Sequence, residues 1–183
     1  MKKIITILVI IVLLCLGYWY WQKKDNKVTK NDPLNATYNI QGVDYTLING
    51  KAEREIAPGS ASKEIISVFG EPVYGDLNGD GVSDAVMYLT QETGGSGTFF
   101  YVVEAINDDG FYRGTNAMYI GDRIAPQNIN IEDGRAVVNF ADRNPGESFS
   151  VKPSLGKSIW VHLDVKNMQI GEWVKDFEGE SNI

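Results

Sequence analysis

The sequence predicts a mainly β (α+β) fold of antiparallel sheets with one short helix, preceded by an N-terminal transmembrane helix. Three observations support this class. Residues 4–21 are apolar and carry no charge, apolar and polar residues alternate from residue 36 onward, and Gly-, Asn- and Asp-containing turns recur at short intervals. Such alternation is typical of half-buried strands, and such turns are typical of hairpins. The 183 residues provide for one anchor and one domain.

The first segment, residues 4–21, has the length and the flanks of a membrane span. As a helix it would extend about 27 Å, close to the thickness of the hydrocarbon layer. Two lysines precede it, two lysines follow it soon after, and its last four residues are aromatic. We expect residues 1–3 in the cytoplasm, a single pass, and the C-terminal domain outside, in the periplasm or at the cell surface. Cleavage as a signal peptide at Cys15-Leu16-Gly17 and lipidation of Cys15 are the alternatives.

Acidic residues dominate the chain beyond the anchor. Six of the 17 basic residues but only one of the 24 acidic residues precede residue 31, which leaves 11 basic and 23 acidic residues, or a net charge of −12. Such a domain repels phosphate backbones, so nucleic acid is not an expected partner. The charge suits cations or basic partners, and it is also explained by simple solvation. With only Cys15 and His162, the chain lacks the residues of most zinc sites and of Ser-His-Asp or Cys-His nucleophile systems.

The elements follow in order along the exported part. Residues 22–35 are polar and without pattern, which predicts a short stalk, and the domain is expected over residues 36–183. A hairpin is expected around Gln41-Gly42, and Asn49-Gly50 marks the next turn. The one helix is expected between Pro58 and Gly70, because cap-type residues precede an apolar stripe made by Ile65, Ile66, Val68 and Phe69.

Strands account for the remainder of the predicted domain. The segment 98–106 is almost continuously apolar and predicts a central strand that is covered on both faces. In 157–165 the residues alternate, so that Ile159 and its alternate neighbours face one way and Trp160 and His162 the other. The acidic tail from residue 176 is expected to fray. The other expected strands are 37–40, 43–48, 51–56, 85–89, 111–120 and 135–140.

The acidic loop at residues 76–84 is the candidate metal site. Oxygen-bearing side chains stand at its positions 1, 3, 5 and 9, and Gly81 at position 6 permits the sharp turn that brings the Val82 carbonyl toward the same point. Ca²⁺ takes six to eight such oxygens, and three crowded carboxylates repel one another without a cation. The loop therefore predicts a calcium site with the ligands Asp76, Asn78, Asp80, Val82 and Asp84. The alternative is a polar turn made of turn-forming residues.

This loop resembles the Asp-x-Asp/Asn-x-Asp-Gly-x-x-Asp calcium loops between strands of FG-GAP and related extracellular β-repeats. It is not an EF-hand, because Met87 stands where the closing glutamate would be. The repeated blades of those families do not transfer, since the chain has one such loop. A wider resemblance, to an uncharacterised family of bacterial exported proteins, covers segments 75–81, 89–91, 94–103, 121–127, 141–143, 145–147 and 177–180. It implies no activity.

Two hypotheses for the function follow from these residues. The first is a non-enzymatic, membrane-anchored module in which Ca²⁺ rigidifies a loop between strands. The alternative is a cell-envelope glycan hydrolase that uses Asp122, Asp142 and Glu147, because paired carboxylates carry such chemistry. The Asp-Arg pairs at 122–123 and 142–143 are equally explained as salt-bridged loop anchors. The sequence identifies no protein or glycan partner.

Overall fold

The described part of the chain, residues 32–174 of a computed structural model, folds into β-strands joined mostly by tight turns. Within this range no helix is long and apolar enough to cross a membrane. The expected membrane span at 4–21 and the acidic tail at 176–183 lie outside the described residues. The elements are η1 (Pro33–Asn35), β1 (Thr37–Ile40), β2 (Val43–Thr46), β3 (Lys51–Glu55), β4 (Lys63–Gly75), β5 (Asp84–Glu92), β6 (Phe99–Asp108), β7 (Phe111–Gly114), β8 (Met118–Asp122), β9 (Ala125–Glu132), β10 (Arg135–Asp142), β11 (Leu155–Asp164) and β12 (Gln169–Trp173).

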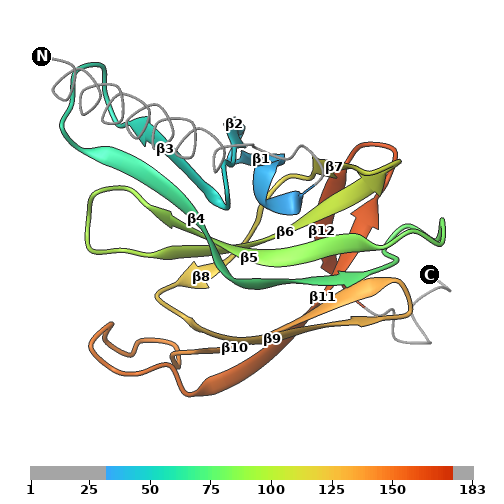
Figure 1. Cartoon of the computed structure of the whole chain (residues 1–183). Coiled ribbons are helices and arrows are strands. Elements are labelled where there is room, and N and C mark those ends of the chain that lie inside the picture. Colours follow the sequence, from blue (N-terminus) through green and yellow to red (C-terminus); the bar gives the residue numbers. More distant parts are fainter. Residues whose placement is uncertain (1–31, 175–183) are drawn as a thin grey trace, which may run out of the picture.

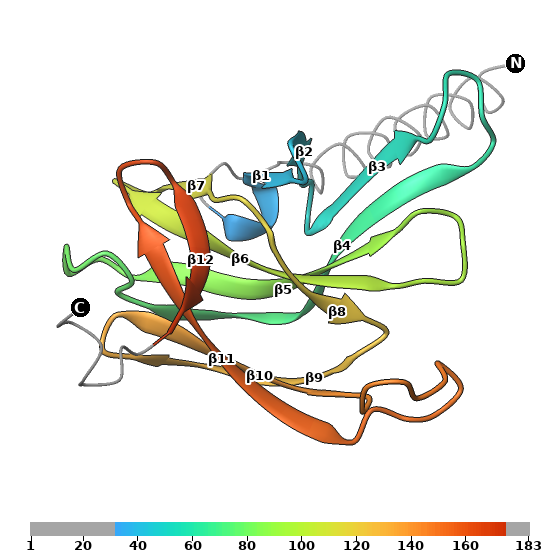
Figure 2. The same cartoon turned by 180° about the vertical axis from the view of Figure 1, so that it is seen from behind.

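Residues 32–174 form three antiparallel sheets in successive layers, which confirms the mainly β prediction. A six-stranded sheet has the order β3-β4-β5-β6-β7, with β8 also paired to β6, and a four-stranded sheet has the order β12-β11-β10-β9. The short hairpin of β1 and β2 lies over the other face of the six-stranded sheet (Figure 1). Seen from behind, the β3–β4 hairpin projects to one side of these layers (Figure 2).

Strands β5 and β6 are covered on both faces, as the apolar segment 98–106 predicts. Side chains such as Val102 on β6 face the four-stranded sheet, and their neighbours such as Val103 face the β1–β2 hairpin. The hydroxyl of Tyr88 on β5 crosses to the four-stranded sheet and donates to the carbonyl oxygens of Asn128 and Asn139. The two large sheets are therefore joined by a polar bridge as well as by apolar packing.

The expected helix between Pro58 and Gly70 is wrong: residues 63–75 form β4, the longest strand. Ile65, Ile66 and Val68 are β-branched and favour an extended backbone, and β4 pairs with β3 on one side and β5 on the other. Gly70, with a φ of 75°, lies in a bulge between Phe69 and Val73, where the register with β5 shifts. The positive φ that closes a helix thus serves here to bend a strand.

The folded domain begins before residue 36. Asp32 caps the short η1 turn by accepting a hydrogen bond from the Leu34 N–H, and Pro33 is buried. The Tyr38 hydroxyl donates to the Pro33 carbonyl oxygen, 2.7 Å away, and the Leu34 carbonyl oxygen accepts from the Gly50 N–H. Residues 32–35, which the sequence places in the stalk, therefore belong to the packed structure.

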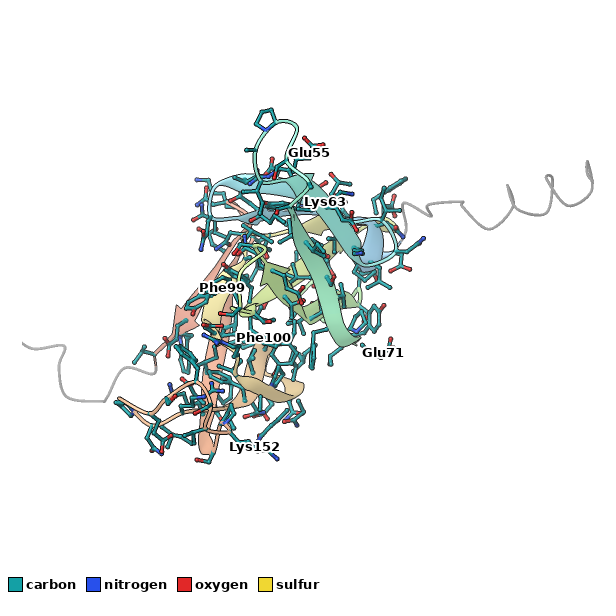
Figure 3. The ribbon with its side chains drawn as sticks, turned by 90° about the vertical axis from the view of Figure 1, so that its left-hand side faces the viewer. Glu55, Lys63, Glu71, Phe99, Phe100 and Lys152 are labelled. Carbon is teal, nitrogen blue, oxygen red and sulfur yellow. The ribbon has the colours of Figure 1, made fainter. Side chains whose placement is uncertain are left out.

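The hairpin turns follow the local residues. Gln41-Gly42 and Asn49-Gly50 both have two consecutive positive φ angles, which suit the right-handed twist of a hairpin. The expected strand 111–120 is divided into β7 and β8, because the residues between them, Thr115 and Ala117, hydrogen-bond to Asn39 of β1. In the view along the layers, Glu55 and Lys63 mark one end of the molecule and Lys152 the other, with Phe99 and Phe100 of β6 between them (Figure 3).

Candidate functional site

Loop 76–84 joins β4 to β5 and curls around the carboxylate of Asp76. One oxygen of Asp76 accepts from the Gly79 N–H at 2.6 Å, and the other accepts from the Gly81 N–H at 2.9 Å. Both glycines have φ near 80°, a conformation that other residues rarely adopt. These backbone donors, Gly81 first, lower the pKa of Asp76, so this carboxylate stays ionised inside the curl.

The next two predicted ligands continue the same curl. The Asn78 side-chain oxygen accepts from the Asp80 N–H at 2.9 Å, and an Asp80 oxygen accepts from the Val82 N–H at 2.7 Å. The Asn78 amide also donates to the second Asp80 oxygen. Asp80 and Val82 are exposed, whereas Asp76 and Asn78 are half-buried. Asp76, Asn78 and Asp80 are therefore held together by the loop's own backbone.

Asp84, the last predicted side-chain ligand, is fully buried. One of its oxygens accepts from the Leu77 N–H and the other from the Asn107 N–H, each at 2.9 Å. Burial raises the pKa of Asp84, the two hydrogen bonds oppose that rise, and the charges of Asp80 and Asp76 add to it. Asp84 therefore fastens the loop to the end of β6.

The loop thus has two parts. We call Asp76, Asn78, Asp80 and Val82 the outer curl, and the buried Asp84 the inner anchor. Within residues 32–174, no group of three or more His, Cys, Asp or Glu side chains is arranged so that it could hold a metal ion. The acidic side chains of the outer curl are Asp76 and Asp80, and its other predicted ligands, Asn78 and Val82, offer neutral oxygens. Any ion at the curl would depend on these neutral oxygens and on water, because Asp84 is turned toward backbone donors.

Glu104 lies close to this anchor and is a residue that sequence reasoning missed. It sits on β6 in the apolar layer between the two large sheets, only 1% exposed, and its Oε2 has no hydrogen-bond partner among the described residues. Burial raises the pKa of Glu104 to about 8, and the charge of Asp84 contributes to the rise. The signal in the sequence is a single acid within the otherwise apolar segment 98–106.

The second group of candidate acids is Asp122, Asp142 and Glu147. Asp122 pairs with Phe99 at the start of β6, whereas loop 76–84 lies at the other end of that strand. The structure brings the 122–123 and 142–143 segments together, because the Arg143 Nη1 donates to the Arg123 carbonyl oxygen at 2.8 Å. Arg143 also donates to the carbonyl oxygens of Phe149 and Val151. Its guanidinium therefore joins its own loop to the segment at Arg123.

The three acids of this group are also engaged. Asp122 pairs with Arg123 at 2.8 Å and accepts from a backbone N–H, and Glu147 accepts from the backbone and side chain of Asn144. Asp142 pairs with Lys157 at 2.7 Å, and this hydrogen bond is the main cause that lowers the pKa of Asp142. A general acid needs a raised pKa, so this geometry favours loop anchoring over glycan hydrolysis.

The outer face of the four-stranded sheet carries the two tryptophans of the described region. Trp160 and Trp173 are cross-strand partners with ring centroids 5.9 Å apart, and the Arg135 guanidinium lies 4.7 Å from the Trp173 centroid. The alternation predicted for 157–165 is confirmed up to Leu163, because Ile159, Val161 and Leu163 face the core. It is wrong for Val165, which follows the end of β11 and is exposed. His162 is exposed on the same outer face as the tryptophans.

Comparison with known proteins finds no matching family model, no matching curated protein and no matching solved structure. A proposal for the function therefore rests on the geometry of the chain's own residues.

Proposed function

We propose that the chain is a membrane-anchored, extracytoplasmic binding module without catalytic activity, in which loop 76–84 takes up Ca²⁺ and the ion rigidifies the connection between β4 and β5. The observation that carries this proposal is the curl itself, where side-chain oxygens of Asp76, Asn78 and Asp80 accept hydrogen bonds from backbone N–H groups two to five residues later in the chain. The anchor rests on the apolar segment 4–21 and its flanking lysines.

The chemistry of the curl suits a hard divalent cation. A carboxylate has about four lone-pair sites, so the oxygens of Asp76 and Asp80 keep acceptor capacity after each takes its hydrogen bonds. Carbonyl and amide oxygens complete calcium shells together with water. In this arrangement Asp76, Asn78, Asp80 and the Val82 carbonyl provide oxygens, and Asp84 contributes its charge from behind the curl.

Binding at this place would stabilise the centre of the domain. The loop leads directly into β5, whose residues from 84 to 91 are all buried, and Asp84 ties the start of β5 to Asn107 of β6. Positive charge beside Asp76, Asp80 and Asp84 relieves their mutual repulsion, so the folded state gains free energy that the unfolded chain does not. The expected consequence is a stiffer link between the two central strands.

Thermal melting of the full chain, in EGTA and in about 5 mM Ca²⁺, tests the proposal, since extracellular sites bind at about 10⁻⁴–10⁻³ M. A ligand at ten times its Kd adds roughly 1.4 kcal/mol, which raises the Tm of a domain of this size by about 3–6 °C. Asp80→Asn keeps an acceptor for the Val82 N–H but removes the charge, and it should abolish the rise.

Glu92→Gln is the matched control, because it removes one exposed carboxylate at the other end of β5. This variant should keep the calcium-dependent rise in Tm. Melting curves of the unaltered chain that coincide in EGTA and in Ca²⁺ would refute the calcium site, and a rise of equal size in Asp80→Asn would place the ion elsewhere.

A further inference from the structure

A cavity of about 320 Å³ opens beside the β1–β2 turn, at the end of β5 that is remote from loop 76–84. Its polar lining includes Gln41 from the turn, Glu64 from β4 and Gln91 from β5. Its aromatic lining comes from Phe99 and Tyr101 of β6, with Tyr119 of β8; Phe99 is labelled in Figure 3. Five separate segments of the chain therefore contribute to one hollow.

The polar groups of this cavity form a connected chain of hydrogen bonds. The Gln41 amide donates to the Tyr101 hydroxyl at 3.0 Å, and that hydroxyl donates to the Gln91 side-chain oxygen at 2.7 Å. The Gln91 amide in turn donates to the Glu64 Oε1 at 2.6 Å. Glu64, Gln91 and Tyr101 are buried, so each group is held in one orientation before any ligand arrives.

The charge of the cavity is balanced by residues outside it. Arg54 pairs with the Glu64 Oε2 at 2.8 Å, and the Tyr45 hydroxyl donates to the same oxygen. Burial acts to raise the pKa of Glu64, but the hydrogen bonds from Tyr45 and Gln91 and the charge of Arg54 outweigh it and lower the pKa. Glu64 is thus ionised and neutralised by Arg54, so the site has no excess charge for an ionic ligand.

The aromatic side gives the cavity an apolar face. The rings of Tyr101 and Tyr119 meet edge to face with centroids 5.5 Å apart, and Tyr119 is 52% exposed. An exposed tyrosine ring beside fixed amide and carboxylate groups offers flat apolar area together with hydrogen-bonding partners. Tyr119 therefore has room to take a ligand on one side while Tyr101 supports it on the other.

We propose that this cavity binds a neutral saccharide. Hydroxyl groups both donate and accept, which matches the exposed amide of Gln41 and the hydroxyl of Tyr119. The C–H face of a sugar ring packs on an aromatic ring, and a volume of 320 Å³ lies near the lower end of the range of small-molecule sites. The Glu64 carboxylate would repel an anion. A cation would gain little from Glu64, because Arg54 already neutralises its charge.

The test is saturation-transfer NMR on the full chain in a zwitterionic detergent, because a sugar-headed detergent would compete. The probes are maltose, lactose and N,N′-diacetylchitobiose at up to about 20 mM, in EGTA and in Ca²⁺. Saturable binding of at least one probe is expected. Tyr119→Ala should weaken it about tenfold, the effect of losing one aromatic stacking partner.

Tyr74→Ala is the matched control, because Tyr74 is also 52% exposed but does not line the cavity. It should leave the affinity unchanged. Gln41→Gly removes the outermost amide at a position whose φ of 51° suits glycine, and it should also weaken binding. No saturable binding of any probe, or binding that Tyr119→Ala leaves unaltered, would overturn the saccharide site. Saccharide binding in EGTA would show that this site works without calcium, so the saccharide proposal and the calcium proposal can fail independently.

Discussion

Glu104 lies in the apolar layer between the two large sheets, and Glu104→Gln tests how strongly this buried acid sets the stability of the domain. In the folded state its pKa is about 8, whereas its ordinary value is 4.5. Below pH 4.5 the folded and unfolded chains both carry the proton, so Glu104 adds no dependence on pH. Between pH 4.5 and 8 only the folded chain keeps it, so rising pH favours unfolding by about 1.4 kcal/mol per unit.

The magnitude follows from these two values. The cost accumulates to roughly 5 kcal/mol once the pH exceeds about 8, a large fraction of the free energy of unfolding of a typical domain. Glutamine does not titrate, so Glu104→Gln removes this dependence. Its amide places unpaired donors in the core at a cost of about 1–3 kcal/mol. The variant should therefore be less stable than the unaltered chain at pH 5 and more stable at pH 8.

Urea unfolding of both chains at pH 5, 6, 7 and 8, followed by tryptophan fluorescence, measures the two curves. They should cross within this interval, because every other titrating group is common to both chains. Glu92→Gln, which alters an exposed acid on the neighbouring strand, should stay parallel to the unaltered chain. Parallel curves for Glu104→Gln across the whole interval would refute the raised pKa of Glu104.

Two further predictions concern how loops and layers are held. Gly114→Ala would put a methyl group 2.2 Å from the Thr37 carbonyl oxygen and should cost about 3 kcal/mol or more in urea unfolding. The methyl group of Gly171→Ala meets no atom of the described residues within 4 Å, so this change should cost less than about 1 kcal/mol. Equal losses would contradict the close approach of β1 to β7. In Arg143 three different guanidinium nitrogens reach three carbonyl oxygens, and the compact ammonium of Arg143→Lys lacks this planar fork. Hydrogen exchange over residues 144–151 should therefore accelerate with little change in Tm, and unchanged exchange would count against this anchor.

The hairpins illustrate what local sequence predicts well. Asn49-Gly50 and Asp133-Gly134 both take consecutive positive φ angles, which Asn, Asp and Gly tolerate, and the residues on either side of each turn pair with one another. In β11 the alternation alone assigns Val161 to the core and Trp160 to the outer face. Turn geometry and the period of a strand are local properties, so neighbouring residues decide them.

The helix expected between Pro58 and Gly70 shows where local reasoning fails. Its apolar stripe fits a helical period over a short stretch, but the same residues lie beside β5 and complete a six-stranded sheet. The backbone hydrogen bonds to β3 and β5, together with burial of Ile66, outweigh a weak local preference. A segment of mixed preference takes the conformation that its distant neighbours stabilise.

The sequence by itself determined the strand-rich class, the turns and the acidic curl at residues 76–84, because each depends on residues close together in the chain. Only the tertiary structure decided that Asp84 turns inward to the Asn107 N–H, that the Glu104 Oε2 has no hydrogen-bond partner within residues 32–174, and that five segments line one cavity. The physical reason is the same in all three cases. Burial and long-range pairing set the surroundings of a polar group, and those surroundings come from strands that are distant in sequence.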